Sequence, residues 1–257
     1  MEMTGNTILI TGGGSGIGRG LAEAFHRAGN QVIIAGRRVD LLESVAVANP
    51  GMKTAMLDVN DEASVARFAD ATARDYPALN VLINNAGIMK AENWLEDTVD
   101  TKIAGDTIHT NLLAPIQLTA ALLPQLRKQS RATIMTVTSG LAYLTMAATP
   151  SYCATKAAMH AFGDALRYQL RETNVDVLEI APPYVQTELM GEHQASDPHA
   201  MPLDAFIAEV MALLAARADD QEILVERVRP LRFAAEQGQQ KYRQQFAAFN
   251  DAMAARR

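Results

Sequence analysis

The 257-residue sequence predicts an α/β protein in which one domain holds a doubly wound parallel sheet with helices on both faces. Three observations support this fold class. Short β-rich runs alternate with longer helical patterns over the first 180 residues. Most of these runs are continuously apolar, as expected for strands covered on both faces, and a glycine-rich stretch follows the first of them. The length allows one large domain or two small ones, and the absence of a linker or internal repeat favours one.

The predicted strands are runs enriched in β-branched and other apolar residues. They lie far enough apart in the sequence for a helical crossover between neighbours, which a parallel sheet requires. The strands cover Thr7–Ile10, Gln31–Ala35, Lys53–Leu57, Val81–Ile83, Ala132–Val137 and Val175–Ile180, and Ile223–Val225 is a candidate for a last strand.

Apolar residues spaced three and four apart predict the helices between these strands. One stripe runs from Ile17 to Ala28, and Gly29 suits the position just after the end of this helix. A longer helix contains 112–123, and Pro115 and Pro124 are expected to bend it.

The pattern changes beyond the first 187 residues, so we divide the single predicted domain into three regions. Residues 1–187 form the core that carries the motifs discussed below. Residues 188–216 begin with a polar, proline-containing stretch and end in a predicted helix at Leu203–Ala216. This region is either a lid over a substrate or a plain surface loop. Residues 217–257 form a tail whose last helix, Gln239–Ala255, is expected to dock on the domain or on another subunit.

Composition excludes several classes of protein. The chain has 29 acidic and 23 basic residues, a net charge of −6 and a pI near 5.4, which argues against nucleic-acid binding. A single cysteine, Cys153, cannot form an internal disulfide or a cysteine-based zinc site. The five histidines show no convincing metal-ligand spacing with carboxylates, so we predict no metal.

No targeting or membrane segment is predicted. The N-terminus lacks the basic and apolar regions of a signal peptide. Residues 132–155 are uncharged, but Gly140, Pro150 and several threonines interrupt the apolar stretches, so they do not read as a membrane span. We therefore expect a soluble, cytoplasmic protein without membrane insertion.

A glycine-rich loop follows the first predicted strand and leads into a helix. The sequence Thr11-Gly-Gly-Gly-Ser-Gly-Ile-Gly18 fits the spacing G-x-x-x-G-x-G. Glycines let backbone N–H groups approach a pyrophosphate at the positive end of a helix, although a glycine-rich turn without a ligand is the alternative. Five glycines at a strand–helix junction favour a nucleotide. The candidate contacts are Gly12, Gly14, Ser15, Gly16, Ile17 and Gly18.

The end of the second predicted strand indicates which nucleotide binds. In nicotinamide-binding folds an acidic residue at this place holds the ribose 2′-hydroxyl, whereas arginine accommodates a 2′-phosphate. Here the strand is followed by Arg37 and Arg38, and Asp40 comes later, where it can serve the next helix. The alternative is a pair of exposed surface arginines. We predict a preference for NADP(H) over NAD(H). After the third strand, Asp58 either contacts the adenine or simply precedes a helix that starts at Asp61.

Tyr152 and Lys156 stand four residues apart in a predicted helix and therefore share one face. Tyrosine, with an ordinary pKa near 10, is a poor acid–base catalyst at neutral pH, and a neighbouring cation lowers that pKa. The pair alone is a weak signal, because this spacing arises by chance in many proteins.

Other residues join this pair in a fixed order along the chain. Asn84-Asn-Ala-Gly87 follows the fourth strand, Asn111 lies inside the long helix, and Ser139 closes the fifth strand, 13 residues before Tyr152. With the glycine loop, this set resembles the compact short-chain dehydrogenases/reductases from Thr7 to about Thr187. The stretches APPYVQTEL, SYCATKAA and MTGNTILITGG are similar to the DltE-like branch. The resemblance implies a Rossmann-like fold.

The resemblance also implies roles for individual residues. Tyr152 is the general acid in carbonyl reduction and the base in alcohol oxidation, and Lys156 lowers the pKa of Tyr152 and binds the nicotinamide ribose. Ser139 orients the substrate oxygen, and Asn111 holds a water that links Lys156 to solvent. Further implied cofactor contacts are Asp58, Val59, Asn85, Ala86, Gly87, Pro182, Val185 and Thr187.

One departure from the family pattern lies after the sixth strand. Where the family has Pro-Gly, this chain has Pro182-Pro183, and Pro183 lacks an N–H donor and the freedom of glycine. Val185 and Thr187 remain available to hold the nicotinamide carboxamide.

The expected activity is NADPH-dependent reduction of a carbonyl group, or the reverse oxidation of a secondary alcohol. A hydrophobic ketone or aldehyde is favoured because the candidate pocket residues are mostly apolar, although each is equally explained as core. The alternatives are an NADP-sensing regulator without turnover and a sugar-nucleotide epimerase or dehydratase. The resemblance implies a homodimer or homotetramer. The candidate pocket residues are Ser139, Leu141, Tyr143, Met146, Tyr184 and Met190.

Overall fold

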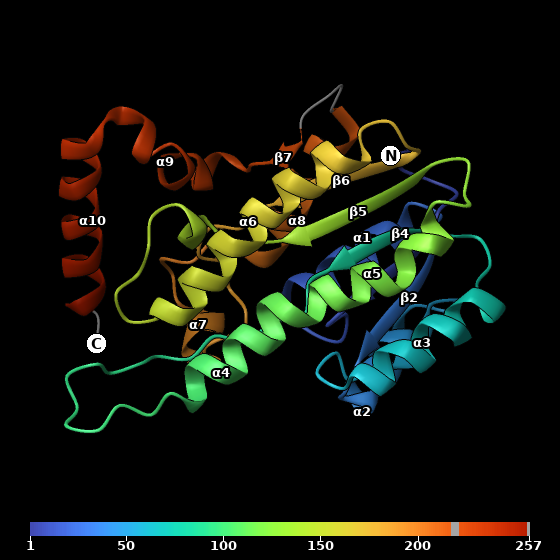
Figure 1. The fold of residues 1–257 in the computed structure, drawn as a ribbon, viewed down its shortest axis with the longest axis horizontal. Coiled ribbons are helices and arrows are strands. Elements are labelled where there is room, and N and C mark those ends of the chain that lie inside the picture. The colour runs from blue at the N-terminus through green and yellow to red at the C-terminus, as the bar shows by residue number, and fades with distance from the viewer. Residues whose placement is uncertain (217–220, 256–257) are drawn as a thin grey trace.

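The parallel strands of the computed structural model form one sheet in the order β3-β2-β1-β4-β5-β6-β7 (Figure 1). The structure describes residues 1–216 and 221–255. Two stretches of the predicted tail, 217–220 and 256–257, lie outside the described residues. Within the described ranges the strands are β1 Thr7–Thr11, β2 Gln31–Gly36, β3 Lys53–Met56, β4 Leu79–Asn84, β5 Ala132–Val137, β6 Val175–Ile180 and β7 Glu222–Ile223.

The strand order reverses direction at β1, which pairs with both β2 and β4. Thr11 is in register with Ala35 of β2, and Ile10 is in register with Ile83 of β4. In an open parallel sheet, ligands bind in the crevice beyond the carboxyl ends of the strands at such a switch point. The doubly wound, Rossmann-like fold predicted from the sequence is confirmed, and it places the glycine-rich loop at this crevice.

Helices cover both faces of the sheet. Their main positions follow the predicted alternation with the strands, and a π-helical segment joins two of them. The helices are α1 Gly16–Arg27, α2 Val39–Ala48, α3 Glu62–Asp75, α4 Lys102–Ile108, the π-helix His109–Leu113, α5 Ala114–Leu126, α6 Pro150–Leu170, α7 Glu192–Ser196, α8 Leu203–Ala216, α9 Arg229–Arg232 and α10 Gln239–Ala254, with short 3-10 turns at Gly140–Ala142, Glu226–Val228 and Ala235–Gln237.

Two apolar clusters form the core, one on each face of the sheet. Successive side chains of a strand point to opposite faces, so Ile8 and Ile10 join one cluster while Leu9 joins the other. The first cluster packs under α1, α2 and α8, and the second under α3, α5 and α6 (Figure 1). Burial on both faces explains why the strands are continuously apolar.

Several boundaries differ from the prediction. The long helix begins earlier, at Lys102, and changes to a π-helix before α5. Pro115 lies in the first turn of α5, where a missing N–H costs little, and Pro124 lies inside it. β7 is shifted by one residue toward the N-terminus of the predicted run. Among the described helices, none combines the length and the apolar content that crossing a bilayer requires.

The region predicted as a lid divides into two parts. α8 matches the predicted bounds, but it packs against α1 and buries Phe206, Ile207, Val210 and Leu214 in the core. Of this region, Glu188, Leu189 and Gln194 border the cavity described below.

The terminal helix α10 stands at the end of the molecule opposite α3 (Figure 1). None of its described residues is buried, and Tyr242 stacks on Phe246 with 6.4 Å between ring centroids. Asn250 ties the helix to the loop before α6: its Oδ1 accepts from the Ala147 N–H at 2.6 Å, and its Nδ2 donates to the Thr145 carbonyl at 3.1 Å. The predicted docking of this helix on its own domain therefore takes place through the loop before α6.

Two glycines of similar local structure are expected to respond oppositely to alanine. A Cβ on Gly18 would lie 2.4 Å from the backbone oxygen of Gly12, so Gly18→Ala is expected to lower the free energy of unfolding by about 2 kcal/mol. Gly163 lies inside α6 with nothing within 4 Å of such a Cβ, so Gly163→Ala is expected to raise it by about 0.5–1 kcal/mol. Urea denaturation measures both, and equal effects of one sign would contradict the packing argument.

Candidate active site

A cavity of about 540 Å³ opens along the carboxyl edge of the sheet. Arg37 and Arg38 line one end of the cavity, the glycine-rich loop lines its middle, and Ser139, Tyr152 and Lys156 line the other end. The cavity therefore joins the predicted phosphate-binding residues to the predicted proton-transfer residues.

The glycine-rich loop leaves β1 in a tight turn. Gly12 has φ +67° and donates its N–H to the Ala35 carbonyl at 2.7 Å, and Gly16 has φ +52° at the start of α1. These φ values lie in the left-handed region that favours glycine. Gly18 does not border the cavity but packs against the loop from beneath, and the loop residues that line the cavity are Gly12, Gly14, Ser15, Gly16 and Ile17.

Thr11 joins the glycine-rich loop to the loop after β4, a role that the sequence did not reveal. Its Oγ1 accepts the N–H groups of Asn85 and Ala86, each at 3.0 Å, and Asn85 donates from Nδ2 to the Thr11 carbonyl at 2.8 Å. Asn85, Ala86 and Gly87 line the cavity as expected. These bonds join the ends of β1 and β4 and hold the crevice open between the two loops.

The end of β2 presents two exposed guanidinium groups to the cavity. Arg38 donates from Nη2 to the Ser15 hydroxyl at 2.8 Å, which links it to the glycine loop, and Arg37 lies beside it. Asp40 lies in the first turn of α2, where a carboxylate stabilises the helix. The donor set at this end of the cavity suits a dianionic phosphate.

Asp58 lies outside the cavity lining, although its neighbours Val59 and Asn60 line it. The Asp58 Oδ1 atom accepts from the Asn60 N–H at 3.0 Å, and Asp61 caps α3 by accepting from Ala63 at 2.9 Å. Of the two roles considered for Asp58, the geometry favours the turn before α3 over an adenine contact.

Tyr152 and Lys156 occupy the first two turns of α6, and each is only 6% exposed. The Lys156 Nζ atom lies 5.5 Å from the centroid of the Tyr152 ring and donates to the Val137 carbonyl at 2.8 Å. Ser139 lies at the end of β5, where its Oγ accepts from the Leu141 N–H at 3.1 Å and caps a 3-10 turn. The three side chains therefore meet at one end of the cavity.

Burial dominates the ionisation of both groups. It raises the pKa of Tyr152, and a hydrogen bond with Ser139 acts against this rise. Burial lowers the pKa of Lys156 to about 8, and the negative charge of Glu179 opposes that change. The net shift of the Tyr152 pKa is therefore upward, because burial outweighs the hydrogen bond, and the lowering of this pKa by Lys156 stays a prediction.

Asn111 lies in the π-helix, 2% exposed, behind the cavity wall. Its Oδ1 accepts from the Ile88 N–H and its Nδ2 donates to the Ile88 carbonyl, both at 2.8 Å. Gly87 separates it from the lysine: a Cβ there would lie 3.2 Å from the Asn111 Oδ1 and 3.8 Å from the Lys156 Nζ. Asn111 is thus adjacent to Lys156, as expected, but does not line the cavity itself.

The segment after β6 closes the cavity on its last side. Pro182, Pro183, Val185 and Thr187 line it, and the Pro182 carbonyl accepts from the Gly140 N–H at 2.8 Å. Gln194 of α7, 5% exposed, donates to the Val185 carbonyl at 2.8 Å and to the Thr187 hydroxyl at 3.1 Å. A single glutamine in a polar stretch gives no sequence signal, so this contact was not foreseen.

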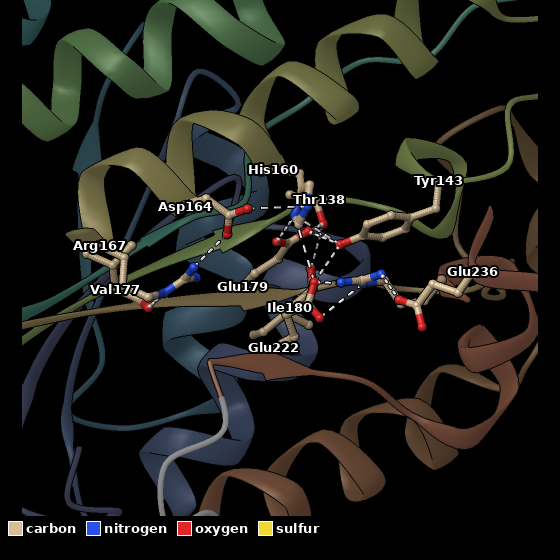
Figure 2. A network of polar contacts seen from close by, with 11 residues as sticks. Thr138, Tyr143, His160, Asp164, Arg167, Val177, Glu179, Ile180, Glu222 and Glu236 are labelled. Carbon is tan, nitrogen blue, oxygen red and sulfur yellow. Dashed lines mark hydrogen bonds and ion pairs between the residues drawn. The ribbon is translucent and has the colours of Figure 1, made fainter. Parts of the chain in front are cut away.

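Apart from Ser139, the residues predicted to contact substrate do not line this cavity. The Tyr143 hydroxyl donates to Glu179 at 2.8 Å and to Glu222 at 3.0 Å, within a polar network outside the cavity (Figure 2). The Tyr184 hydroxyl donates to Asp197 at 3.1 Å. Leu141, Tyr143, Met146, Tyr184 and Met190 all lie outside the lining of this cavity, and their contact with a substrate stays a prediction.

The cavity lining includes apolar residues that the sequence did not indicate. Ile88, Met89 and Leu189 line the cavity, together with the exposed Lys90. They come from the loop after β4 and from the segment after β6, two connections whose inward-facing side chains a sequence pattern does not identify.

The buried lysine is expected to reduce stability at neutral pH. Its pKa falls from an ordinary 10.5 to about 8 on folding, so the unfolded chain binds the proton more strongly, and stability rises with pH between these values. Lys156→Met is expected to raise the free energy of unfolding by about 2 kcal/mol at pH 7, after allowing for the lost bond to Val137. The difference in the free energy of unfolding between Lys156→Met and the wild type decreases as the pH rises above 8.

Urea denaturation at several pH values measures this effect. Lys128→Met, at an exposed lysine, is the matched control and is expected to change little. A less stable Lys156→Met protein at pH 7 would show that the lysine contributes more through its contacts than burial of its charge costs.

Comparisons with known proteins agree with this geometry. The profile of the short chain dehydrogenase family matches residues 6–198. The uncharacterized oxidoreductase DltE of Bacillus subtilis is 42% identical over 237 residues, which cover 91% of this chain and 93% of that protein. The dehydrogenase/reductase SDR family protein 7-like of Drosophila melanogaster is 32% identical over 73% of this chain and 60% of its own length.

Solved structures share the fold. A short-chain dehydrogenase of Burkholderia cenocepacia in complex with NADP has a TM-score of 0.76 and 25% identity, covering 100% of this chain and 98% of its own. A short-chain dehydrogenase of Streptomyces avermitilis has a TM-score of 0.80 at 23% identity, covering 98% of this chain and 99% of its own. The profile match extends over well over half of the chain. The chain therefore belongs to the short-chain dehydrogenase/reductase family of oxidoreductases, within its DltE-like branch.

Proposed function

We propose that this protein is an NADP(H)-dependent oxidoreductase that reduces a hydrophobic ketone or aldehyde, or oxidises the corresponding secondary alcohol. The observation that carries the proposal is the single cavity with Arg37 and Arg38 at one end and Ser139, Tyr152 and Lys156 at the other. Along the cavity, a phosphate site, a glycine-lined wall and a proton donor follow one another in the order that a dinucleotide and its substrate require.

The residues that would hold the cofactor are those of the glycine loop, the two arginines, the loop after β4 and the segment at Pro182–Thr187. The loop backbone at the start of α1 suits a pyrophosphate, and Arg37 and Arg38 suit a 2′-phosphate. The relative of known structure from Burkholderia cenocepacia is bound to NADP, which supports the same choice here. When bound, the nicotinamide supplies or accepts the hydride.

Side chains of the protein carry out the proton transfer. In reduction, Tyr152 donates its phenolic proton to the carbonyl oxygen as negative charge develops there, and Ser139 donates a second hydrogen bond that orients this oxygen. Lys156 then stabilises the phenolate that is left, and Asn111 lies next to Lys156 across Gly87. Burial keeps Tyr152 protonated until the reaction, since the phenol has a raised pKa.

The test is NADPH oxidation by the purified protein with a panel of apolar and polar ketones and aldehydes. We expect turnover with apolar carbonyl compounds and a higher kcat/KM with NADPH than with NADH. Tight NADPH binding without turnover of any compound would instead support a cofactor-sensing regulator. Conversion of a sugar nucleotide without net NADPH consumption would support an epimerase or dehydratase.

The proposal extends to a homodimer or homotetramer in the cytoplasm. Size-exclusion chromatography with light scattering tests the assembly, and a monomer at working concentration would contradict it. Fractionation of the source cells tests the location.

A further inference from the structure

A buried carboxylate lies behind the proposed catalytic residues. Glu179 sits on β6, 3% exposed, with its side chain on the face of the sheet that α6 covers (Figure 2). A buried charge is costly unless hydrogen bonds and opposite charges surround it. The contacts of Glu179 are therefore informative about its role.

Three segments donate hydrogen bonds to this carboxylate. The Thr138 hydroxyl and the Tyr143 hydroxyl, the latter at 2.8 Å, both donate to Oε1, and the His160 Nδ1 lies 2.7 Å from Oε2. Thr138 directly precedes Ser139, Tyr143 lies in the loop from Ser139 to Tyr152, and His160 lies one turn after Lys156 on α6. One side chain thus ties together the strand end that carries Ser139, the loop that follows it and the helix that carries Tyr152 and Lys156.

The ionisation of the cluster agrees with this geometry. Burial alone would raise the pKa of Glu179, but hydrogen bonds from His160, Thr138 and Tyr143 together with the charge of His160 lower it below its ordinary value. Its hydrogen bond to Glu179 raises the pKa of His160, against the effect of burial. Glu179 is also the charge that favours the protonated form of Lys156.

Further ion pairs surround Glu179, and they include Arg167 with Asp164 and Arg232 with Glu236. Arg232 donates from Nε to both oxygens of Glu222, at 2.8 and 3.0 Å, and lies 4.7 Å above the Tyr143 ring. The carboxylate of Asp164 lies 3.6 Å from the His160 Nε2. His160, Glu179 and Glu222 could offer ligand atoms to a cation, but His160 already pairs with the buried Glu179 and Arg232 with the half-buried Glu222. The arrangement is that of an ion-pair network.

We propose that Glu179 is a positioning residue for the proton transfer, holding together the strand end that carries Ser139, the loop to Tyr152 and the helix that carries Tyr152 and Lys156. The inference rests on the proposed function, because it assigns Glu179 to the reaction given to Tyr152. It predicts two separable effects of Glu179, one on geometry and one on charge.

Glu179→Gln keeps the shape and removes the charge. We expect kcat for carbonyl reduction near neutral pH to fall about tenfold with little change in KM, since the reacting groups lose alignment but the cavity lining is unchanged. Without the carboxylate, Lys156 loses its proton more readily, so the alkaline loss of activity is expected to begin about one pH unit lower. Glu222→Gln, in the same network, is the matched control and is expected to leave this alkaline limb in place.

A second measurement reports on Lys156 without any turnover. Competitive labelling of Lys156 with acetic anhydride, followed by mass spectrometry across pH, gives the pKa of its amine directly. We expect a lower pKa in Glu179→Gln than in the wild type and in Glu222→Gln. Thr138→Val removes one hydrogen bond to Glu179 without changing charge. It is expected to lower kcat about threefold while KM stays constant. This variant tests the proposal if Glu179→Gln does not fold.

The outcomes separate the two proposals. A wild type without carbonyl turnover, together with a shifted labelling curve, would reject the proposed function and leave the coupling between Glu179 and Lys156 standing. An active wild type whose pH profile and labelling curve match those of Glu179→Gln would overturn the role of Glu179. With Glu179→Gln unfolded, a Thr138→Val variant with wild-type kcat would overturn it as well.

Discussion

Tyr152→Phe is expected to lower kcat for carbonyl reduction by about 10³-fold, because general acid catalysis by a positioned side chain contributes about 10² to 10⁴-fold. The hydroxyl is the only group removed, and the ring remains packed at the start of α6, where Tyr152 is 6% exposed. NADPH binding, followed by fluorescence titration, is expected to change little. The two measurements together separate the loss of a proton donor from the loss of the site.

Tyr168→Phe is the control for this experiment. Tyr168 lies on the same helix, is 68% exposed and contacts only the surface Arg171 among the ring interactions described. We expect wild-type kcat from this variant. Turnover of Tyr152→Phe within threefold of the wild type would remove Tyr152 from the mechanism, since the lower bound for a general acid is about 10²-fold.

Arg37→Asp is expected to lower kcat/KM with NADPH by about 100-fold and to raise it with NADH. A carboxylate at this end of the cavity repels a 2′-phosphate but accepts a hydrogen bond from a ribose 2′-hydroxyl, and a charge-assisted bidentate contact is worth about 2–3 kcal/mol. Arg37 is exposed and lines the cavity, so the substitution changes the site without disturbing the core.

Steady-state kinetics with both cofactors measure the ratio. Arg27→Asp, at the exposed end of α1 and away from the cavity, makes the same change of charge and is expected to leave the NADPH-to-NADH ratio unaltered. An unchanged ratio in Arg37→Asp would mean that Arg38, which already binds Ser15, carries the preference alone or that the preference is absent.

The parts of the site that the sequence predicted are those encoded by local spacing. The glycine loop needs only a strand, a turn and a helix in succession, and Tyr152 and Lys156 need only one helix with a repeat of 3.6 residues per turn. Asn85 follows its strand directly. For all of them, the position along the chain determines the position in space once the parallel sheet is given.

The parts that could not be predicted depend on contacts between distant segments. Tyr143 is close in sequence to Ser139, but the loop that carries it turns its ring outward to Glu179 and Glu222, on β6 and β7. A loop has no period that tells which side chain faces the cavity. Likewise, Asp164 lies one turn after His160 on α6, but the buried partner of His160 is Glu179, which comes from β6 and is far away in the sequence.

The contacts of Asn250 can form only late during synthesis of the chain. It follows Ala147 by 103 residues and Thr145 by 105, yet it holds the loop that leads into the helix of Tyr152. Chains leave the ribosome from the N-terminus, and domains begin to fold before the last residues appear. The crevice at the carboxyl edge of the sheet can therefore form before α10 is made, whereas the loop that leads to Tyr152 gains these two anchors only after Asn250 has been synthesised.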